Sequence, residues 1–183
     1  PVEAGENALT LRDKDPYDRA VVERNIRRGK AGRVHLTLTV ERLSREGSLT
    51  FEMQDDQGRT PIRLVFMPDG MLRVRGDGRT DPWQPYQAGQ AIGIDVAYDC
   101  DSRRFIVKAL GTEKSFGFSA AVDAITRFRL MSKEKIPRLS TLDDVGKWGA
   151  KEQILPGGEE PTEETVVFVT AMTWKVEETE EHA

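Results

Sequence analysis

Aromatic side chains with polar neighbours are the residues of this sequence best suited to one kind of chemistry, the binding of a sugar. A carbohydrate site stacks an aromatic ring on the apolar face of the sugar, and polar side chains around that ring bond the hydroxyls. Two segments offer such groups: Trp83 and Tyr86 beside Arg79 and Asp81, and Trp148 beside Lys147. We expect these residues to contact carbohydrate. The alternative is that each Trp packs beneath its own loop.

Outward-facing arginines offer a second kind of chemistry, the binding of anions. The hairpin sequence MPDGM, residues 67–71, fits a three-residue loop. That loop pairs Arg63 with Arg75 on the outward face, because a shorter loop would mix buried and exposed faces. Like charges directly opposite one another, as Arg63 and Arg75 would be, destabilise a sheet. Arg127 and Arg129 share another outward face. We therefore expect a carboxylated or sulfated polymer here, unless nearby carboxylates neutralise the arginines.

The chain offers few groups that could perform catalysis. His35, expected on the outward side of a strand, and His182 have no nucleophile partner, so a Ser-His-Asp or Cys-His site is not expected. Cys100 has no His near it in the sequence and is expected to be a structural or incidental thiol, not a nucleophile. We expect a protein without catalytic activity, with a glycoside hydrolase or polysaccharide lyase as the alternative.

The nearest cluster of carboxylates, Glu52, Asp55 and Asp56, runs into a hairpin turn. Aspartates are favoured in turns because their side chains hydrogen-bond the nearby backbone. A pair of catalytic carboxylates needs instead to be held at a set distance on one face of a sheet. The cluster is therefore interpreted as turn chemistry.

Apolar residues alternate with polar ones along most of the chain, which is the pattern of strands with one buried face. The alternating runs lie near residues 7–12, 18–25, 34–40, 49–53, 62–66, 72–75, 92–98, 105–109, 116–118, 128–130 and 165–176. About ten antiparallel strands with a buried face each imply two packed sheets. We predict an all-β fold, an antiparallel two-sheet β-sandwich of jelly-roll type, in which residues 76–90 form a long link between two strands. Trp174 shares the apolar face of its run, so we expect it in the core.

The pattern predicts one domain, residues 1–176, followed by an acidic tail at 177–183. A long irregular connection, at about residues 132–164, interrupts the alternation and is rich in Pro and Gly. Connections of this length are usually functional or mobile.

Composition limits the classes of function. The chain has 183 residues, 38% hydrophobic and 32% charged, so a soluble protein with a substantial core is expected. The net charge of −4 becomes +4 when the eight glutamates near the C-terminus are left out. A mildly basic body suits an anionic ligand, while the acidic whole disfavours nucleic acid. No run is long enough to predict membrane insertion. The chain begins at Pro1 without a signal-peptide pattern, so we expect it to come from a longer protein.

Several segments carry a resemblance to a known fold family. The segment YQAGQAIGIDVAYDCDSRRFIVKALG resembles a recurrent stretch of concanavalin A-like, laminin-G-like sandwiches, and VDAITRFRLMS resembles the strand that follows it there. Earlier segments, DKDPYDRAVVERNI and GSLTFEMQDDQGRTPIRLVFMPDGML, are similar to strands of such domains in bacterial multidomain proteins that degrade polysaccharides. The resemblance supports the fold more strongly than a function.

The resemblance implies a non-catalytic carbohydrate-binding or accessory module of a glycan-active protein, with an acidic polysaccharide as a candidate ligand. Its partners would be a polysaccharide and a catalytic domain of the same parent protein, in an extracellular or periplasmic location. A structural domain that contacts other proteins is a further alternative. No cofactor is expected, although laminin-G-like folds often bind Ca²⁺ through loop carboxylates, and Asp95, Asp99 and Asp101 bracket one hairpin.

Overall fold

A computed structural model describes residues 2–4, 9–14, 19–45, 47–133 and 164–177. These residues form thirteen strands and no helix. The strands are β1 (Val2–Ala4), β2 (Leu9–Asp13), β3 (Val21–Gly29), β4 (Ala31–Arg42), β5 (Ser48–Gln54), β6 (Ile62–Phe66), β7 (Met71–Gly76), β8 (Arg79–Pro85), β9 (Ala91–Asp99), β10 (Arg104–Ala109), β11 (Thr112–Gly117), β12 (Ile125–Lys133) and β13 (Thr165–Val176). Among these residues no helix long and apolar enough to cross a membrane occurs.

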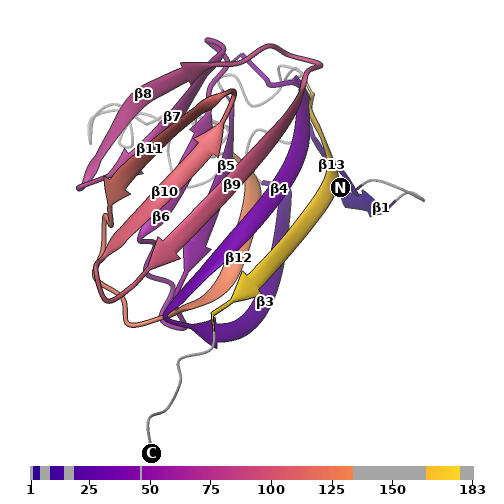
Figure 1. Ribbon diagram of the computed structural model, residues 1–183. Helices are drawn as coiled ribbons and strands as arrows, with labels where there is room; N and C mark the ends of the chain where they lie inside the picture. The colour runs from indigo at the N-terminus through magenta and orange to yellow at the C-terminus, as the bar shows by residue number, and fades with distance from the viewer. Residues whose placement is uncertain (1, 5–8, 15–18, 46, 134–163, 178–183) are drawn as a thin grey trace, which may run out of the picture.

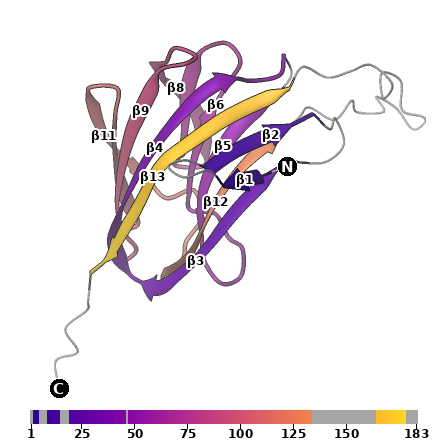
Figure 2. The same ribbon diagram turned by 90° about the vertical axis from the view of Figure 1, so that its right-hand side faces the viewer.

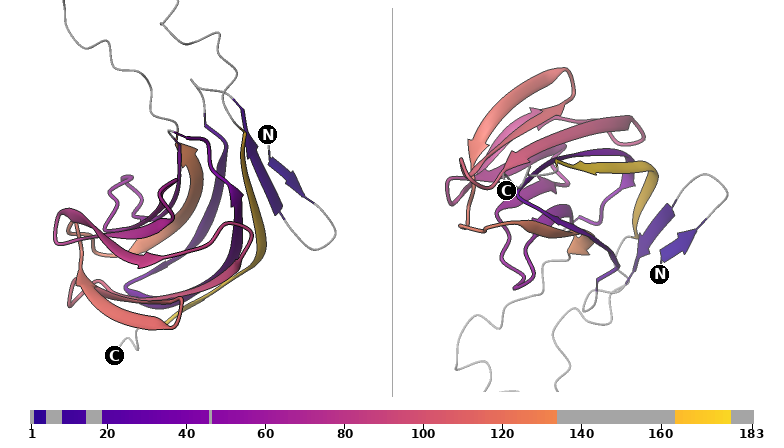
Figure 3. Two further views of the ribbon diagram at one scale, coloured as in Figure 1. Left: turned by 90° about the horizontal axis from the view of Figure 1, so that it is seen from above. Right: turned by 60° about the horizontal axis from the view of Figure 1, so that its bottom comes forward.

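The strands form two antiparallel sheets packed face to face, as the predicted jelly-roll sandwich requires. The seven-stranded sheet has the order β1-β2-β13-β4-β9-β10-β11, and its last five strands lie nearest the viewer in Figure 1. The six-stranded sheet has the order β3-β12-β5-β6-β7-β8 and lies behind it. Figure 2 shows the two layers from the side, and Figure 3 shows from above that both are curved.

The core lies between the sheets and consists of the inward residues of the alternating runs. The largest fully buried side chains include Phe51, Phe66, Phe105 and Phe128. Their rings contact other aromatic rings, as Phe51 and Phe128 do with centroids 6.3 Å apart. Because one face of each sheet is buried in this way, the alternate residues of the same strands must point outward.

The predicted hairpin at residues 67–71 is confirmed. The backbone N–H of Met67 donates to the carbonyl of Met71 over 3.1 Å, and Gly70 has a φ of 76°. The resulting register places Arg63 directly opposite Arg75. The turn therefore fixes which arginines are neighbours on the outward face of the six-stranded sheet.

The prediction that residues 76–90 form a link is wrong for residues 79–85, where β8 pairs with β7. Prolines at positions 82 and 85 suggest a loop, but β8 is an edge strand and needs hydrogen bonds on one side only. The register between the two strands shifts by one residue, and Trp83 is the extra residue on β8. The predicted connection at 132–164 falls mostly outside the described residues.

Asp55 holds the turn after β5 through its carboxylate, as the interpretation of this cluster expects. Its Oδ1 accepts hydrogen bonds from the backbone N–H of Gln57 over 3.0 Å and of Arg59 over 2.7 Å. Its Oδ2 lies 2.6 Å from Arg59 Nε. Burial works to raise the pKa of this carboxyl, but the hydrogen bonds and the charge of Arg59 outweigh burial and lower it.

We expect Asp55→Asn to lower the free energy of unfolding by about 1–3 kcal/mol at pH 7, since a charge-assisted hydrogen bond contributes this much. A lowered folded-state pKa stabilises the protein above the unfolded value of about 3.9 and loses that contribution as the pH falls through the folded value. Urea denaturation between pH 7 and pH 3 should therefore show a gap between wild type and variant that narrows in acid. A constant gap would contradict the ionised role of Asp55.

Candidate functional site

Five arginines gather on the outward side of the six-stranded sheet, and we call this surface the arginine face. They alternate with buried core residues along their strands, so strand geometry directs all five away from the core. The five are Arg63 on β6, Arg73 and Arg75 on β7, and Arg127 and Arg129 on β12. All five are half-buried.

The strand registers align a row of charged side chains straight across this sheet. Arg75 lies opposite Arg63, Arg63 opposite Glu52, Glu52 opposite Arg129, and Arg129 opposite Glu23. Neighbouring strands are about 4.8 Å apart, so each residue in the row lies beside the next. The row therefore alternates in charge except at its β7 end, where two arginines are adjacent.

Glu52 is the buried carboxylate at the centre of the row. Its side chain is 5% exposed, and its Oε1 lies 2.6 Å from Arg63 Nη2. Its Oε2 accepts a hydrogen bond from Gln54 Nε2 over 2.9 Å. Glu52 thus compensates Arg63, and its remaining oxygen is already occupied.

Two further carboxylates pair with three of the other arginines. Glu23 bridges both arginines of β12, with Oε1 3.1 Å from Arg127 Nη1 and Oε2 3.2 Å from Arg129 Nε. Asp69, in the hairpin turn, lies 2.7 Å from Arg73 Nη2. The hydrogen bond from Arg73 lowers the pKa of the Asp69 carboxyl, although burial opposes this. Three carboxylates therefore face five guanidinium groups.

Arg75 is the cation that these acids do not reach. Within the described part of the chain no ion pair or hydrogen bond involves its guanidinium. The Nε atoms of Arg63, Arg73, Arg75 and Arg127 are buried and have no hydrogen-bond partner there, whereas that of Arg129 is ion-paired with Glu23. A buried donor without a partner is costly, and an anion that accepts from it removes that cost. The arginine face can thus receive a ligand carboxylate at Arg75.

The structure places Tyr86 in the core, contrary to the expectation that it contacts carbohydrate. Tyr86 is 8% exposed, its hydroxyl donates to the Met67 carbonyl over 2.6 Å, and its ring packs edge-on against Phe66. Burial, and then the nearby Asp69, raise the pKa of the hydroxyl to about 12, which keeps it a donor. Its role is to anchor the segment after β8 to the hairpin.

Trp83 is half-buried and closes one side of the sandwich. Its ring lies edge-on to Phe116 of β11, with centroids 6.0 Å apart, so it spans from one sheet to the other. The neighbouring sequence candidates, Arg79 and Asp81, are exposed on the same edge strand. Between them Thr80 lies opposite Arg75, so strand alternation directs both away from the arginine face.

We expect Trp83→Ala to lower the free energy of unfolding by about 2 kcal/mol, less than for a fully buried Trp because the ring is half-exposed. The affinity for an acidic glycan should stay within about twofold of wild type, since the ring contacts Phe116 rather than the arginines. Chemical denaturation and calorimetric titration measure the two quantities. Lost affinity at unchanged stability would instead give Trp83 the stacking role expected from the sequence.

Other sequence candidates do not join this site. Trp148 and Lys147 lie outside the described residues. Asp95 pairs with His35, while Asp99 accepts hydrogen bonds from the backbone N–H groups of Asp101 and Ser102 and so forms a turn. No group of three or more His, Cys, Asp or Glu side chains within the described ranges is placed to hold a metal ion. The three aspartates are therefore not gathered in one such group.

Trp174 lies outside the core, contrary to the expectation from its strand pattern, and is 37% exposed. The register of β13 shifts twice, at 166–167 and at 169–171, which moves the inward residues relative to the simple alternation. Its ring lies edge-on to Phe128, and the guanidinium of Arg24 stands 5.1 Å from its centroid. Trp174 thus packs at the side of the sandwich where β13 approaches β3.

The family described as "Sialidase-like, CBM domain" matches residues 1–145. No curated protein sequence matches the chain. A solved structure of a protein described as "Sialidase" superposes with a TM-score of 0.80 at 24% identity, over 96% of this chain and 16% of that one. This chain therefore spans about a sixth of that protein.

Two further solved structures share the fold at lower identity. A family 7 alginate lyase, A1-II′, in complex with a substrate has a TM-score of 0.65 at 11% identity and is covered over 85% of its length by 98% of this chain. A Trypanosoma rangeli sialidase in complex with sialic acid has a TM-score of 0.57 at 15% identity, over 94% of this chain and 26% of that one. At these identities the similarity shows the jelly-roll fold and not a shared activity.

Proposed function

This chain belongs to the sialidase-like CBM domain family, and from that premise we propose that it is a non-catalytic module that binds an acidic glycan through the arginine face. The observation that carries the proposal is Arg75, a half-buried guanidinium next to Arg63 and without a partner among the described residues. Membership in a family of carbohydrate-binding modules supplies the class of ligand. The unpaired arginine indicates that this ligand carries an acidic group.

A carboxylate fits this site better than a neutral hydroxyl does. Arginine binds a carboxylate through two parallel N–H···O bonds, which a hydroxyl cannot match in charge or geometry. Arg63 is already paired with Glu52. The ligand carboxylate would therefore bind the guanidinium of Arg75 and accept further hydrogen bonds from the N–H groups of Arg63 that Glu52 does not use. Two kinds of sugar carry such a group: uronates, and sialic acid, with which the Trypanosoma rangeli sialidase forms a complex.

The enzymatic alternative has less support on this face. Glu52 and Glu23 lie two strands apart in the sheet, which strand spacing sets at about 10 Å, close to the separation in inverting glycosidases. Both are already ion-paired with arginines, however. Neither His35 nor the described tyrosines, Tyr86 and Tyr98, lie on this face, where a catalytic base would be needed. A purely structural domain would gain nothing from two adjacent, unequally paired arginines.

The proposal includes a longer parent protein with a catalytic domain. Because the chain spans only 16% of the sialidase that shares its fold, we infer that it works beside a catalytic domain of a longer chain. The module would hold that domain on an acidic glycan and raise the local concentration of substrate. Glycans of this kind lie outside the cytoplasm, so an extracellular or periplasmic location is proposed.

Affinity electrophoresis tests the proposal. The domain is run through gels that contain an acidic polymer, a polysialic acid or an alginate, or a neutral glucan of similar length, with and without Ca²⁺. We expect retardation by an acidic polymer that weakens as salt rises from 0.05 to about 0.5 M, because salt screens charge contacts. Equal retardation in the neutral gel, or none in either, would contradict an acidic ligand.

A further inference from the structure

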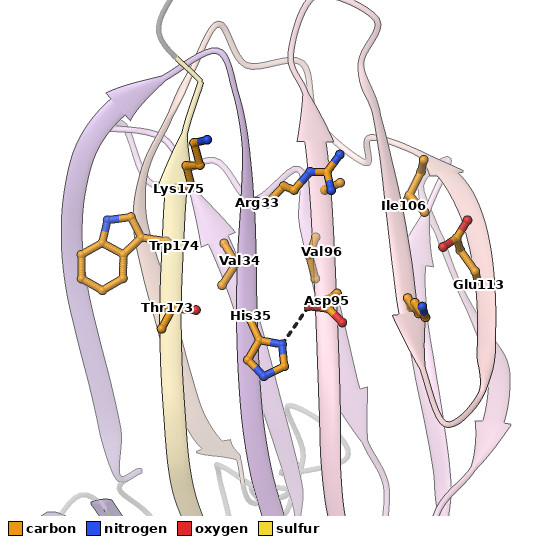
Figure 4. Close-up of a pocket in the computed structure, with 12 residues that line it drawn as sticks. Arg33, Val34, His35, Asp95, Val96, Ile106, Glu113, Thr173, Trp174 and Lys175 are labelled. Carbon is orange, nitrogen blue, oxygen red and sulfur yellow. Dashed lines mark hydrogen bonds and ion pairs between the residues drawn. The ribbon is translucent and has the colours of Figure 1, made fainter.

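The outward face of the seven-stranded sheet, on the opposite side of the sandwich from the arginine face, carries a hollow of about 530 Å³ (Figure 4). The hollow forms over β9, where the outward residue Ala97 is small. Larger side chains rise on both sides of it, from β4 and β13 on one side and from β10 and β11 on the other. We call this cavity the outer hollow.

Two rows of side chains cross the outer hollow in register. The first row is Thr173, His35, Asp95, Lys108 and Glu113, on β13, β4, β9, β10 and β11 in turn. The second row is Lys175, Arg33, Ala97, Ile106 and Ser115 on the same strands. The first row is polar throughout, whereas the second has cations at one end and an apolar floor beside them.

Arg33 and Lys175 are directly opposite each other on adjacent strands. Like charges in this position destabilise a sheet. No ion pair or hydrogen bond of either side chain occurs within the described ranges, although Asp95 and Glu113 lie in the neighbouring row. Figure 4 shows the guanidinium of Arg33 reaching from β4 over β9, above the hollow. An anion bound between these two cations at the rim of the cavity would neutralise their repulsion.

The rest of the outer hollow suits a hydroxylated ring. Ile106 is 41% exposed and stands beside Ala97, so the two give the hollow an apolar floor. His35 is held in place, with Nδ1 2.7 Å from Asp95 Oδ1 and Nε2 3.1 Å from Thr37 Oγ1. Asp95 keeps its second carboxylate oxygen for a ligand hydroxyl, and Lys108 stands opposite it on β10.

We propose that the outer hollow is a second binding site, which takes a single carboxylated sugar unit. The carboxylate lies between Arg33 and Lys175, the ring lies over Ala97 and Ile106, and hydroxyls bond Asp95 and Lys108. The ligand class rests on the proposed function, but the site is separate from the arginine face. Because the two sites lie on opposite faces of the sandwich, one domain holds two glycan ends at once and can cross-link chains.

Calorimetric titration with sialyllactose, and lactose as the neutral control, counts the sites. The wild type is expected to bind two sialyllactose molecules per domain. The variant R33Q/K175Q should lose at least about tenfold in affinity at the outer hollow and bind one, as should R75Q at the arginine face. Arg45→Gln, the same change in the exposed turn after β4, should still bind two. The His35 ring protons should shift with ligand in R75Q but not in R33Q/K175Q.

The outcomes separate this inference from the proposed function. One molecule per wild-type domain, lost in R75Q and kept in R33Q/K175Q, would overturn the outer hollow and leave the arginine face standing. One molecule per wild-type domain, lost only in R33Q/K175Q, would support the outer hollow and overturn the arginine face. No binding by the wild type would overturn both sites. A thermal melt shows that R33Q/K175Q is folded, and its Tm should equal or exceed that of wild type because a repulsive pair is gone.

Discussion

Replacement of Arg75 by Gln should lower the affinity for a carboxylated glycan about 10- to 100-fold and leave the protein at least as stable as wild type. A charge-assisted, bidentate hydrogen bond contributes about 1.5–3 kcal/mol, which corresponds to that range of dissociation constants. Stability should not fall because Arg75 has no partner among the described residues and repels Arg63 across the strand pair. Calorimetric titration at the arginine face and thermal unfolding measure the two effects.

Arg45→Gln is the matched control for this variant, since it removes the same charge from an exposed turn. Its affinity should stay within about twofold of wild type. An equal loss in both variants would mean that only the overall charge attracts the glycan. Full affinity in R75Q would place the ligand away from the unpaired guanidinium.

Glu52→Gln should have the opposite combination of effects, a less stable protein that binds the acidic glycan more tightly. Glu52 is 5% exposed and lies 2.6 Å from Arg63, so its neutralisation leaves that guanidinium without its counter-ion. Breaking a buried pair costs about 3–5 kcal/mol, and because Arg63 is 29% exposed we expect about 2–3 kcal/mol. The loss of one negative charge should improve affinity for a carboxylate about threefold or more.

Urea denaturation and calorimetric titration of E52Q test both parts, with Glu41→Gln, an exposed carboxylate at the end of β4, as the control. The control should change neither quantity by much. The combination distinguishes a binding site from a catalytic one. If Glu52 were a catalytic carboxylate, the wild type would cleave the glycan and E52Q would not. We expect no cleavage by either protein. Unchanged stability of E52Q would contradict its compensating role.

The sequence predicts the local part of the arginine face and not the part built by distant strands. Arg63 and Arg75 are joined by one hairpin, and loop length together with one-sided burial leaves a single register for them. Arg129 meets Glu52 only because β12 pairs with β5, a contact between segments far apart in the chain. Nothing local in the sequence specifies that pairing, so the local pattern assigns Glu52 to a turn cluster instead.

The strand that carries Trp83 escapes prediction from the sequence for a related reason. The Pro-rich segment around Trp83 has the composition of a loop, but an edge strand tolerates prolines because only one of its sides is hydrogen-bonded. Its ring then packs on Phe116, which belongs to the edge strand of the other sheet. The outer hollow has no local signal either, because its cation pair, Arg33 and Lys175, comes from opposite ends of the chain.

A crystal structure of the domain with bound sialyllactose tests the central claim most directly. We predict that one sugar carboxylate lies within hydrogen-bond distance, about 2.7–3.2 Å, of the guanidinium of Arg75. Arg63 should keep its contact with Glu52 in that complex. Ligand density confined to other surfaces, with the Arg75 guanidinium contacting no sugar, would contradict the arginine face as the glycan site.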